Sequence, residues 1–240
     1  HEVLGYRGLA FSYRGETKAI PVLSRSADIS GLEFDFTTII REVTGERRTV
    51  GFVSGHGEPS INPPPPQKQP GMPPQDPGVS YLHKLVKNYN LRSVELGSTK
   101  IDPQEMRGLM VIGPTQNIPE SDLYALDQYI MRGGAVAFLV NGVTIQESQT
   151  AINATTNETG LEDMLETYGV RIGHDVVLDT QTDRYLVTKH VRTPLGNLPM
   201  TLPRPYPAWP HFAAAEIAEE HPILFRLPGI SLLWPSSVRV

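Results

Sequence analysis

A chain of 240 residues can bury a sizeable core, and its 39% hydrophobic and 20% charged residues are typical of a soluble globular protein. The net charge of −5 and the absence of basic runs argue against a nucleic-acid surface, and the absence of cysteine excludes disulfides and thiol chemistry. Its apolar runs are too short to span a bilayer, and it shows no signal peptide. Because it opens on His1 and stops on Val240 inside a strand-like run, we expect it to be a piece of a longer protein.

The first part of the chain predicts a hairpin, a helix and a buried strand. Gly8–Tyr13 and Thr17–Leu23 alternate as strands around a short polar turn. Helical spacing of apolar residues predicts a helix over Leu32–Val43, capped by Ser30. The apolar run Val50–Val53 then predicts a strand.

The proline-rich segment Pro59–Pro77 predicts a long, stiff loop of polyproline II character, either mobile or a docking element. Apolar residues at helical spacing then predict a helix from Val79 to near Asn90. Leu91–Leu96 and Leu109–Ile112 follow as strands, the second apolar throughout, as in a strand covered on both faces.

The second half of the chain continues with alternating elements. A helix capped by Ser121 should end at Gly133, in the left-handed conformation that follows many helices. The remaining predicted elements are a core strand over Ala135–Val140, a helix from Leu161 to Tyr168 stopped by Gly169, and a strand over Val176–Leu178. The proline-rich stretch beyond Arg192 predicts an extended, irregular segment, and His221–Val240 predicts one or two edge strands.

Strand–helix alternation from about residue 49 to 180 predicts an α/β protein with a mostly parallel sheet and helices on both faces, flanked by β segments. We divide the chain into an N-terminal hairpin and helix (1–45), an α/β core (46–190) and a proline-rich extension with C-terminal strands (191–240).

The glycine-rich turn after the Val50–Val53 strand is the main candidate site, because α/β folds place their sites at the carboxyl ends of strands. His56 and Glu58 are two residues apart, so in an extended turn they could converge on one metal ion or one water. The favoured alternative is structural: both side chains hydrogen-bond the loop. A ligand contact without catalysis is the next possibility. The candidates for a third metal ligand have no diagnostic spacing; they are His83, His174, Asp175 and Asp179.

Two further groups are candidates for binding. Gly113, Thr115 and Asn141 follow predicted core strands, so their turns should lie near His56, although simple turn chemistry explains them as well. An aromatic strip set among prolines either contacts a sugar or a partner protein, or packs onto the sheet; it contains Tyr206, Trp209 and Phe212.

The order of several blocks resembles the auxiliary proteins of ABC transporters that are related to the gliding-motility transporter component. The blocks are Leu32-Glu33-Phe34-Asp35-Phe36-Thr37 with Ile39-Ile40, Val50 to Pro59 with its Gly-His-Gly-Glu turn, Val111-Ile112-Gly113-Pro114 with Leu126 to Ile130 and Gly133-Gly134, and Leu161 to Val170 with Val176-Val177-Leu178-Asp179.

This resemblance implies a three-layer core similar to flavodoxin and to class I glutamine amidotransferases. It also implies an extracytoplasmic, periplasmic domain of a protein anchored by membrane helices, with an ABC transporter permease or another membrane subunit as partner. The sequence departs from the enzymes of that fold because it has no cysteine nucleophile, and it has no Gly-x-Ser-x-Gly motif.

We therefore expect a non-catalytic domain that needs no cofactor and acts in transport through protein or ligand contacts. The alternatives are a hydrolase or metal-dependent enzyme using His56 and Glu58, and a carbohydrate-binding module based on the aromatic strip.

Overall fold

The computed structural model describes residues 8–20, 29–45, 48–62, 78–86, 89–98, 101–147, 152–193, 196–217, 224, 227 and 229–240. The chain forms two compact units, which are described separately below. The first comprises His1–Pro114 with Pro119–Leu139, and the second comprises Thr115–Ile118 with Val140–Val240. Most of the predicted proline loop, residues 63–77, lies outside the described residues.

The first unit begins with a hairpin of β1 (Leu9–Tyr13) and β2 (Glu16–Ile20), joined by a two-residue turn. Arg14 and Gly15 both have positive φ, 47° and 91°, as the tight turn of a twisted hairpin requires. Helix α1 (Ile29–Thr44) follows. The prediction of a cap at Ser30 is wrong, because the helix already includes this residue.

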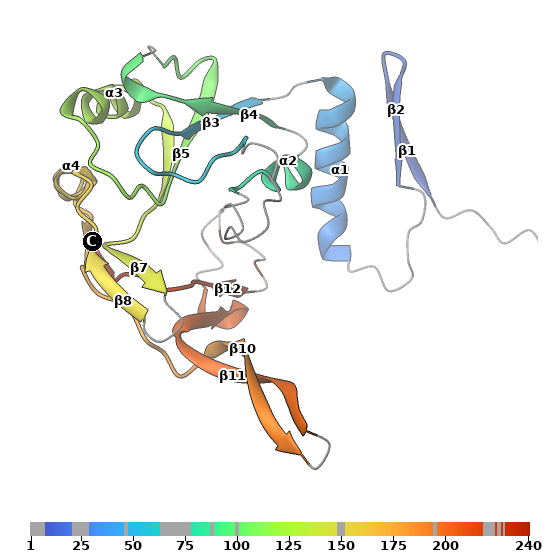
Figure 1. The fold of residues 1–240 in the computed structure, drawn as a ribbon. Helices are drawn as coiled ribbons and strands as arrows, with labels where there is room; N and C mark the ends of the chain where they lie inside the picture. Colours follow the sequence, from blue (N-terminus) through green and yellow to red (C-terminus); the bar gives the residue numbers. More distant parts are fainter. Residues whose placement is uncertain are drawn as a thin grey trace, which may run out of the picture. The chain divides into compact units, whose positions relative to one another are not determined.

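Four parallel strands form the central sheet of the first unit, in the order β4-β3-β5-β6 (Figure 1). They are β3 (Arg48–Val53), β4 (Tyr89–Val94), β5 (Met106–Ile112) and β6 (Ala135–Leu139). The prediction of a parallel α/β sheet is confirmed for this part of the chain.

The core of this sheet is packed tightly around a glycine. Gly51 on β3 is buried, and a Cβ there would overlap the side chains of Met106, Leu109 and Val94. These neighbours on β4 and β5 fill the space above Gly51, so close packing makes a side chain at this position unfavourable.

The predicted helix from Val79 to Asn90 is wrong at its end, because β4 begins at Tyr89. Among the described residues of this stretch, the helix is the short α2 (Leu82–Leu85). Tyr89 and its successors pair along the whole of β3, so the long-range backbone ladder overrides the local helical spacing. The 3₁₀ helix η1 (Leu96–Ser98) follows β4.

Helix α3 (Glu120–Met131) connects β5 to β6. Pro119, not the predicted Ser121, precedes its first turn, and the predicted left-handed end at Gly133 is confirmed by its φ of 85°. Tyr129 is fully buried, and its hydroxyl donates to the carbonyl of Met106 at 2.8 Å. This bond ties the helix to the start of β5.

Strand β6 is an edge of the four-stranded sheet and its residues alternate between exposed and half-buried, so the prediction of a core strand here is wrong. Sequence hydrophobicity cannot distinguish the two cases, because Ala135–Leu139 is apolar throughout.

In the second unit the strands are antiparallel, so the predicted alternation up to residue 180 ends at β6. A hairpin of β7 (Val143–Glu147) and β8 (Ile152–Thr156) precedes α4 (Leu161–Thr167). Strand β9 (Arg171–Ile172) pairs with β13 (Val238–Arg239).

Val176–Leu178, predicted as a strand, forms no ladder. Its backbone instead makes isolated hydrogen bonds, such as that from the N–H of Val177 to the carbonyl of Pro235 at 2.8 Å. The end of the preceding helix is as predicted, because Gly169 has a φ of 87°.

The proline-rich stretch is extended as predicted but not irregular. It forms β11 (Gly196–Ala213), which pairs with β10 (Thr182–Thr193) in a long antiparallel ribbon (Figure 1). The 3₁₀ helix η2 (Ala214–Glu216) follows, and β12 (Gly229–Ser231) pairs with the end of β11. The two short strands β12 and β13 confirm the prediction of edge strands at the end of the chain.

None of the helices in the described residues has both the length and the apolar character needed to cross a bilayer.

Candidate functional site

The candidate site begins where β3 ends. After Val53 the chain turns sharply, and Gly55 and Gly57 take φ values of 119° and 85° that are unfavourable for other residues. These two glycines turn the backbone on either side of His56. The side chain of Glu58 folds back over the turn, where its Oε2 accepts the backbone N–H of His56 at 2.7 Å.

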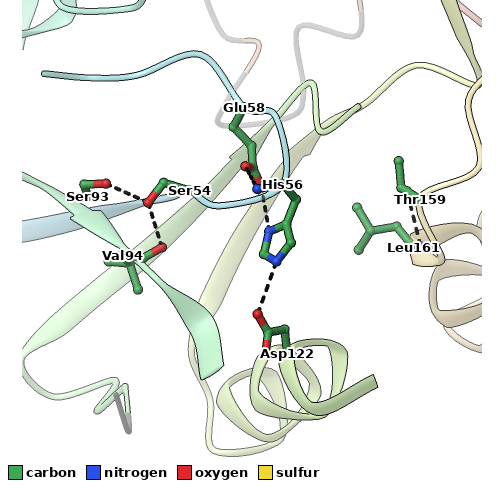
Figure 2. A network of polar contacts seen from close by, with 8 residues as sticks. All are labelled: Ser54, His56, Glu58, Ser93, Val94, Asp122, Thr159 and Leu161. Atoms are coloured by element: carbon green, nitrogen blue, oxygen red, sulfur yellow. Dashed lines mark hydrogen bonds and ion pairs between the residues drawn. The ribbon is translucent and has the colours of Figure 1, made fainter. Parts of the chain in front are cut away.

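The imidazole of His56 lies between two carboxylates (Figure 2). Its Nδ1 is 3.2 Å from Oε1 of Glu58, and its Nε2 is 3.1 Å from Oδ2 of Asp122. Asp122 lies in the first turn of α3, where the partial positive charge of the helix N-terminus stabilises a carboxylate. The turn after β3 is thereby connected to α3.

This cluster is buried. The side-chain exposures are 8% for His56, 1% for Glu58 and 14% for Asp122. A neutral imidazole donates from one ring nitrogen only, whereas the imidazolium donates from both and satisfies both carboxylates. Both ring nitrogens already have partners, so the ring has no nitrogen left for a substrate or a metal.

The cluster also has the wrong geometry for a metal ion. The carboxylates contact opposite nitrogens of the ring, so the three groups do not converge on one point. Across the described residues, no group of three or more His, Cys, Asp or Glu side chains could hold a metal.

The serine just before this turn, Ser54, has hydrogen-bond partners on the neighbouring strand. The hydroxyl of Ser54 is 2.7 Å from that of Ser93, and it also donates weakly to the carbonyl of Val94 at 3.4 Å. These contacts link the ends of β3 and β4. An activated serine would need a base within hydrogen-bond reach.

Sequence reasoning missed Asp122. The acidic first turn after Pro119 indicates a helix start, but 66 residues separate Asp122 from His56 and no local pattern predicts their contact. The order of the strands decides it, because β3 and β5 are neighbours and α3 follows β5.

Of the three residues whose turns were predicted to lie near His56, only Gly113 belongs to the same unit as His56. Gly113 follows β5 at the same end of the sheet as His56, and its N–H donates to the carbonyl of Leu139 at 2.8 Å. Thr115 and Asn141 belong to the second unit. Thr115 is exposed, and the carbonyl of Asn141 accepts from the side-chain amide of another residue, Asn157, at 3.0 Å.

The two other histidines considered as metal ligands have local partners. His83 is exposed, and its Nε2 is 3.2 Å from Oδ1 of Asn62. His174 belongs to the second unit, where its Nδ1 is 3.0 Å from the carbonyl of Gly142.

Of the aspartates considered as metal ligands, Asp175 joins its loop to a distant segment and Asp179 holds a local turn. Asp175 accepts the N–H and the hydroxyl of Ser237, each at 2.8 Å, and these hydrogen bonds lower the pKa of its carboxyl. Asp179 accepts the N–H of Gln181 at 2.9 Å, and this bond likewise lowers the pKa of Asp179. Both carboxylates are occupied by the protein's own donors.

The aromatic strip lies on β11, and Tyr206, Trp209 and Phe212 are all half-buried. The hydroxyl of Tyr206 accepts the indole N–H of Trp234 at 2.9 Å, and its ring lies 5.7 Å from that of Tyr185 at a tilt of 40°. These contacts describe packing within the second unit.

A cavity of about 150 Å³ lies beside β4, lined by Arg92, Ser93, Val94, Glu95, Ile101, Asp102, Glu105 and Met106. The residues of the His56 cluster do not line it. It is smaller than the roughly 300–1,000 Å³ of typical small-molecule pockets.

Two known proteins show a distant likeness to the chain. An uncharacterized protein of Borreliella burgdorferi is 21% identical over 177 residues, which cover 72% of this chain but only 32% of that protein. The chain thus spans about a third of that relative. Among solved structures, the mmIFT52 N-terminal domain is 19% identical and covers 65% of both chains, with a TM-score of 0.39 that is too low to establish a common fold.

A family model described as an ABC-type uncharacterized transport system matches residues 47–240. The matched region starts just before β3 and includes the His56 cluster, the central sheet and the whole second unit. The resemblance to auxiliary proteins of ABC transporters is confirmed, and the chain belongs to this family of auxiliary components of ABC-type transport systems.

Proposed function

We propose that the chain is a non-catalytic, extracytoplasmic domain of a membrane-anchored ABC transporter auxiliary protein, and that it acts through protein contacts with a membrane subunit of the transporter. The observation that carries the non-catalytic role is the burial of His56 between Glu58 and Asp122. The strongest candidate for acid–base chemistry is thus engaged in linking the turn after β3 to α3.

Two further features support this proposal. The chain has no cysteine for an amidotransferase-type nucleophile. The cavity of about 150 Å³ beside β4 and a larger one of about 470 Å³, lined by residues of the β1–β2 hairpin and the end of α1, both lack His56, Glu58 and Asp122 in their linings, so neither places a substrate against the candidate base. Protein contact is therefore favoured over ligand turnover.

We also propose that the central sheet is the core of a three-layer fold similar to flavodoxin and to class I glutamine amidotransferases. The order β4-β3-β5-β6 corresponds to 2-1-3-4 when the parallel strands are numbered along the chain. Flavodoxin-like sheets have the order 2-1-3-4-5, so the four strands fit the first part of that pattern.

Location can be tested on the full-length protein with reporters fused at the end of this domain. Alkaline phosphatase should be active and green fluorescent protein dark if the domain lies outside the cytoplasm. The opposite result would reject the extracytoplasmic location.

The role in transport can be tested by reconstituting the ABC transporter with and without the auxiliary protein and measuring its ATPase activity and transport. We expect activity to depend on the auxiliary protein and to survive Glu58→Gln in folded protein. Hydrolysis of ester, amide or glycoside substrates by the purified chain, lost in a folded Glu58→Gln variant, would instead support the enzyme alternative.

A further inference from the structure

The ribbon of β10 and β11 is the longest antiparallel pair among the described strands of the second unit. The sheet order is β10-β11-β12, so β10 is an edge strand, and β12 pairs only with the end of β11, from His211 to Ala213 (Figure 1). An isolated two-stranded ribbon is only marginally stable in water, and a third strand would stabilise it. The ribbon therefore has one side on which a strand could be added.

The prolines of β11 determine which backbone groups face outward. Pro203 pairs with Leu186, and Pro205 pairs with Arg184. Proline has no N–H, so these positions must be the pairs of an antiparallel ladder that exchange no hydrogen bonds. In such pairs the backbone groups of both residues point away from the partner strand, so the N–H and C=O groups of Arg184 and Leu186 point to the open side of β10.

The two edges of the ribbon consequently differ. The outer edge of β11 lacks donors at Pro203 and Pro205, and prolines at an edge block the addition of another strand. Strand β10 (Thr182–Thr193) contains no proline. Strand β10 therefore keeps its outward N–H and C=O groups. In this part of the ribbon, the β10 edge can accept a new strand and the β11 edge cannot.

The side chains beside this edge are apolar and basic. Leu186 is 64% exposed and Tyr185 is 50% exposed, so both present apolar surface beside this edge that an added strand would cover. Arg184 on β10 and Arg204 on β11 are exposed, and because Arg204 pairs with Tyr185 the two arginines lie on opposite faces of the ribbon. The acidic residue beside Arg184, Asp183, lies 3.7 Å from Nδ1 of His211. Each face of this part of the ribbon therefore carries one exposed arginine, within a chain whose net charge is −5.

We propose that the edge of β10 binds an extended, acidic segment of a partner protein, which adds to the ribbon as a third strand. Main-chain hydrogen bonds from Arg184 and Leu186 would supply affinity, as in other complexes formed by strand addition. The arginines would select acidic side chains over basic ones. Pairing of two copies of this chain through antiparallel β10 strands is disfavoured, because it would bring the arginines of both copies together.

This inference rests on the proposed protein-contact role and names the surface that makes the contact. Its test uses the purified chain and a synthetic probe, so it can fail while the transport and location experiments succeed, and the reverse also holds.

The probe is a fluorescein-labelled peptide of about ten residues in which glutamate alternates with valine and threonine. Its binding is followed by fluorescence anisotropy while the concentration of the unlabelled chain is raised to about 1 mM. This range covers weak strand addition. A peptide with lysine in place of glutamate is the charge control. We expect the acidic peptide to bind at least about tenfold more tightly than the lysine peptide, and more weakly as salt is raised.

Two matched variants separate backbone from side-chain effects. Leu186→Pro removes the outward N–H without removing a donor of the β10–β11 ladder, and it should weaken binding by about tenfold or more. Leu186→Thr keeps that N–H and should bind within about threefold of the wild type. Circular dichroism and melting temperature verify that both variants fold.

Four results would overturn the proposal. The first is no binding of the acidic peptide over the whole range, and the second is equally tight binding of the lysine peptide. A folded Leu186→Pro variant that binds like the wild type would exclude the β10 edge. Light scattering that reveals a dimer abolished by Leu186→Pro would assign the edge to a second copy of the chain instead.

Discussion

At the end of β3, each ring nitrogen of His56 meets a carboxylate, and the backbone N–H of the same residue is bonded to Glu58. Along β10, backbone groups at Arg184 and Leu186 point to a side on which no described strand lies. Polar groups of the first region are buried and satisfied, whereas those of the second are exposed and available. This difference is the basis of the two proposals, that the glycine–histidine turn serves the fold and that the ribbon serves interaction, and the following predictions test it.

The largest effect is expected for His56→Ala. Removing the imidazole leaves the carboxylates of Glu58 and Asp122 in a buried site without their common partner, which should lower the free energy of unfolding by about 3–5 kcal/mol. For a chain of this size this corresponds to a fall in melting temperature of roughly ten degrees. Urea unfolding followed by circular dichroism measures it.

His83→Ala is the matched control for this change. His83 is exposed and its ring contacts the exposed side chain of Asn62, so its loss should change the free energy of unfolding by less than about 0.5 kcal/mol. Equal effects of the two substitutions would refute the structural role of the cluster. In a double-mutant cycle, His56→Ala and Asp122→Ala should be strongly non-additive, because the two side chains are in direct contact.

The next largest effect concerns the packing of the central sheet around Gly51 on β3. Gly51→Ala would place a Cβ against Met106, Leu109 and Val94, and overpacking of this kind should cost about 1–3 kcal/mol of unfolding free energy. Gly108→Ala on the adjacent strand is the control, because its nearest neighbour would be 3.7 Å away. Thermal unfolding should show a loss for Gly51→Ala and none for Gly108→Ala. A stable Gly51→Ala variant would contradict close packing of the sheet.

A smaller effect is expected for Tyr129→Phe. It removes the donor to the buried carbonyl of Met106 and should cost about 1–2 kcal/mol in the free energy of unfolding at neutral pH. Chemical unfolding of the two proteins under identical conditions measures this difference. No loss of stability would mean that the bond between α3 and β5 contributes little.

The same residue has a consequence at alkaline pH. Burial raises the pKa of Tyr129 above its usual value of 10.0, so the folded protein keeps the phenolic proton where the unfolded chain loses it. The resulting contribution to stability is present below about pH 10 and is lost as the pH rises through the pKa of the folded state. The wild type should therefore lose stability more steeply than Tyr129→Phe above about pH 10, and parallel curves would contradict this.

The smallest effect is expected on the ribbon itself. Leu186→Thr replaces a side chain that is 64% exposed by one suited to a strand, so the free energy of unfolding should change by less than about 0.5 kcal/mol. Differential scanning calorimetry beside the wild type measures it. A loss as large as that of Gly51→Ala would mean that Leu186 belongs to a core, and the contrast between the two regions would disappear.

Several elements could be predicted because short-range signals specify them. The apolar run of β3 followed by glycine and histidine predicted a strand and a turn, and Gly133 and Gly169 predicted the ends of α3 and α4 through their left-handed conformation. The order of such blocks was also sufficient to identify the family. These features depend on residues close together in the chain.

Other features depended on which segments meet in space. Helical spacing predicted a helix as far as Asn90, followed by a strand from Leu91, but pairing with β3 starts the strand at Tyr89. Prolines in β11 suggested irregular structure, but pairing with β10 makes a ribbon in which they occupy the positions that need no donor.

The candidate site divides in the same way. The sequence by itself determined that His56 and Glu58 lie in one glycine-rich turn. The two residues are only two positions apart, and the positive φ angles of Gly55 and Gly57 bring their side chains together. Only the tertiary structure decided that Asp122 closes the cluster, because the parallel order of β3 and β5 carries α3 to the histidine. Local conformational preferences act over a few residues, whereas burial and strand pairing act between residues that the chain itself keeps far apart.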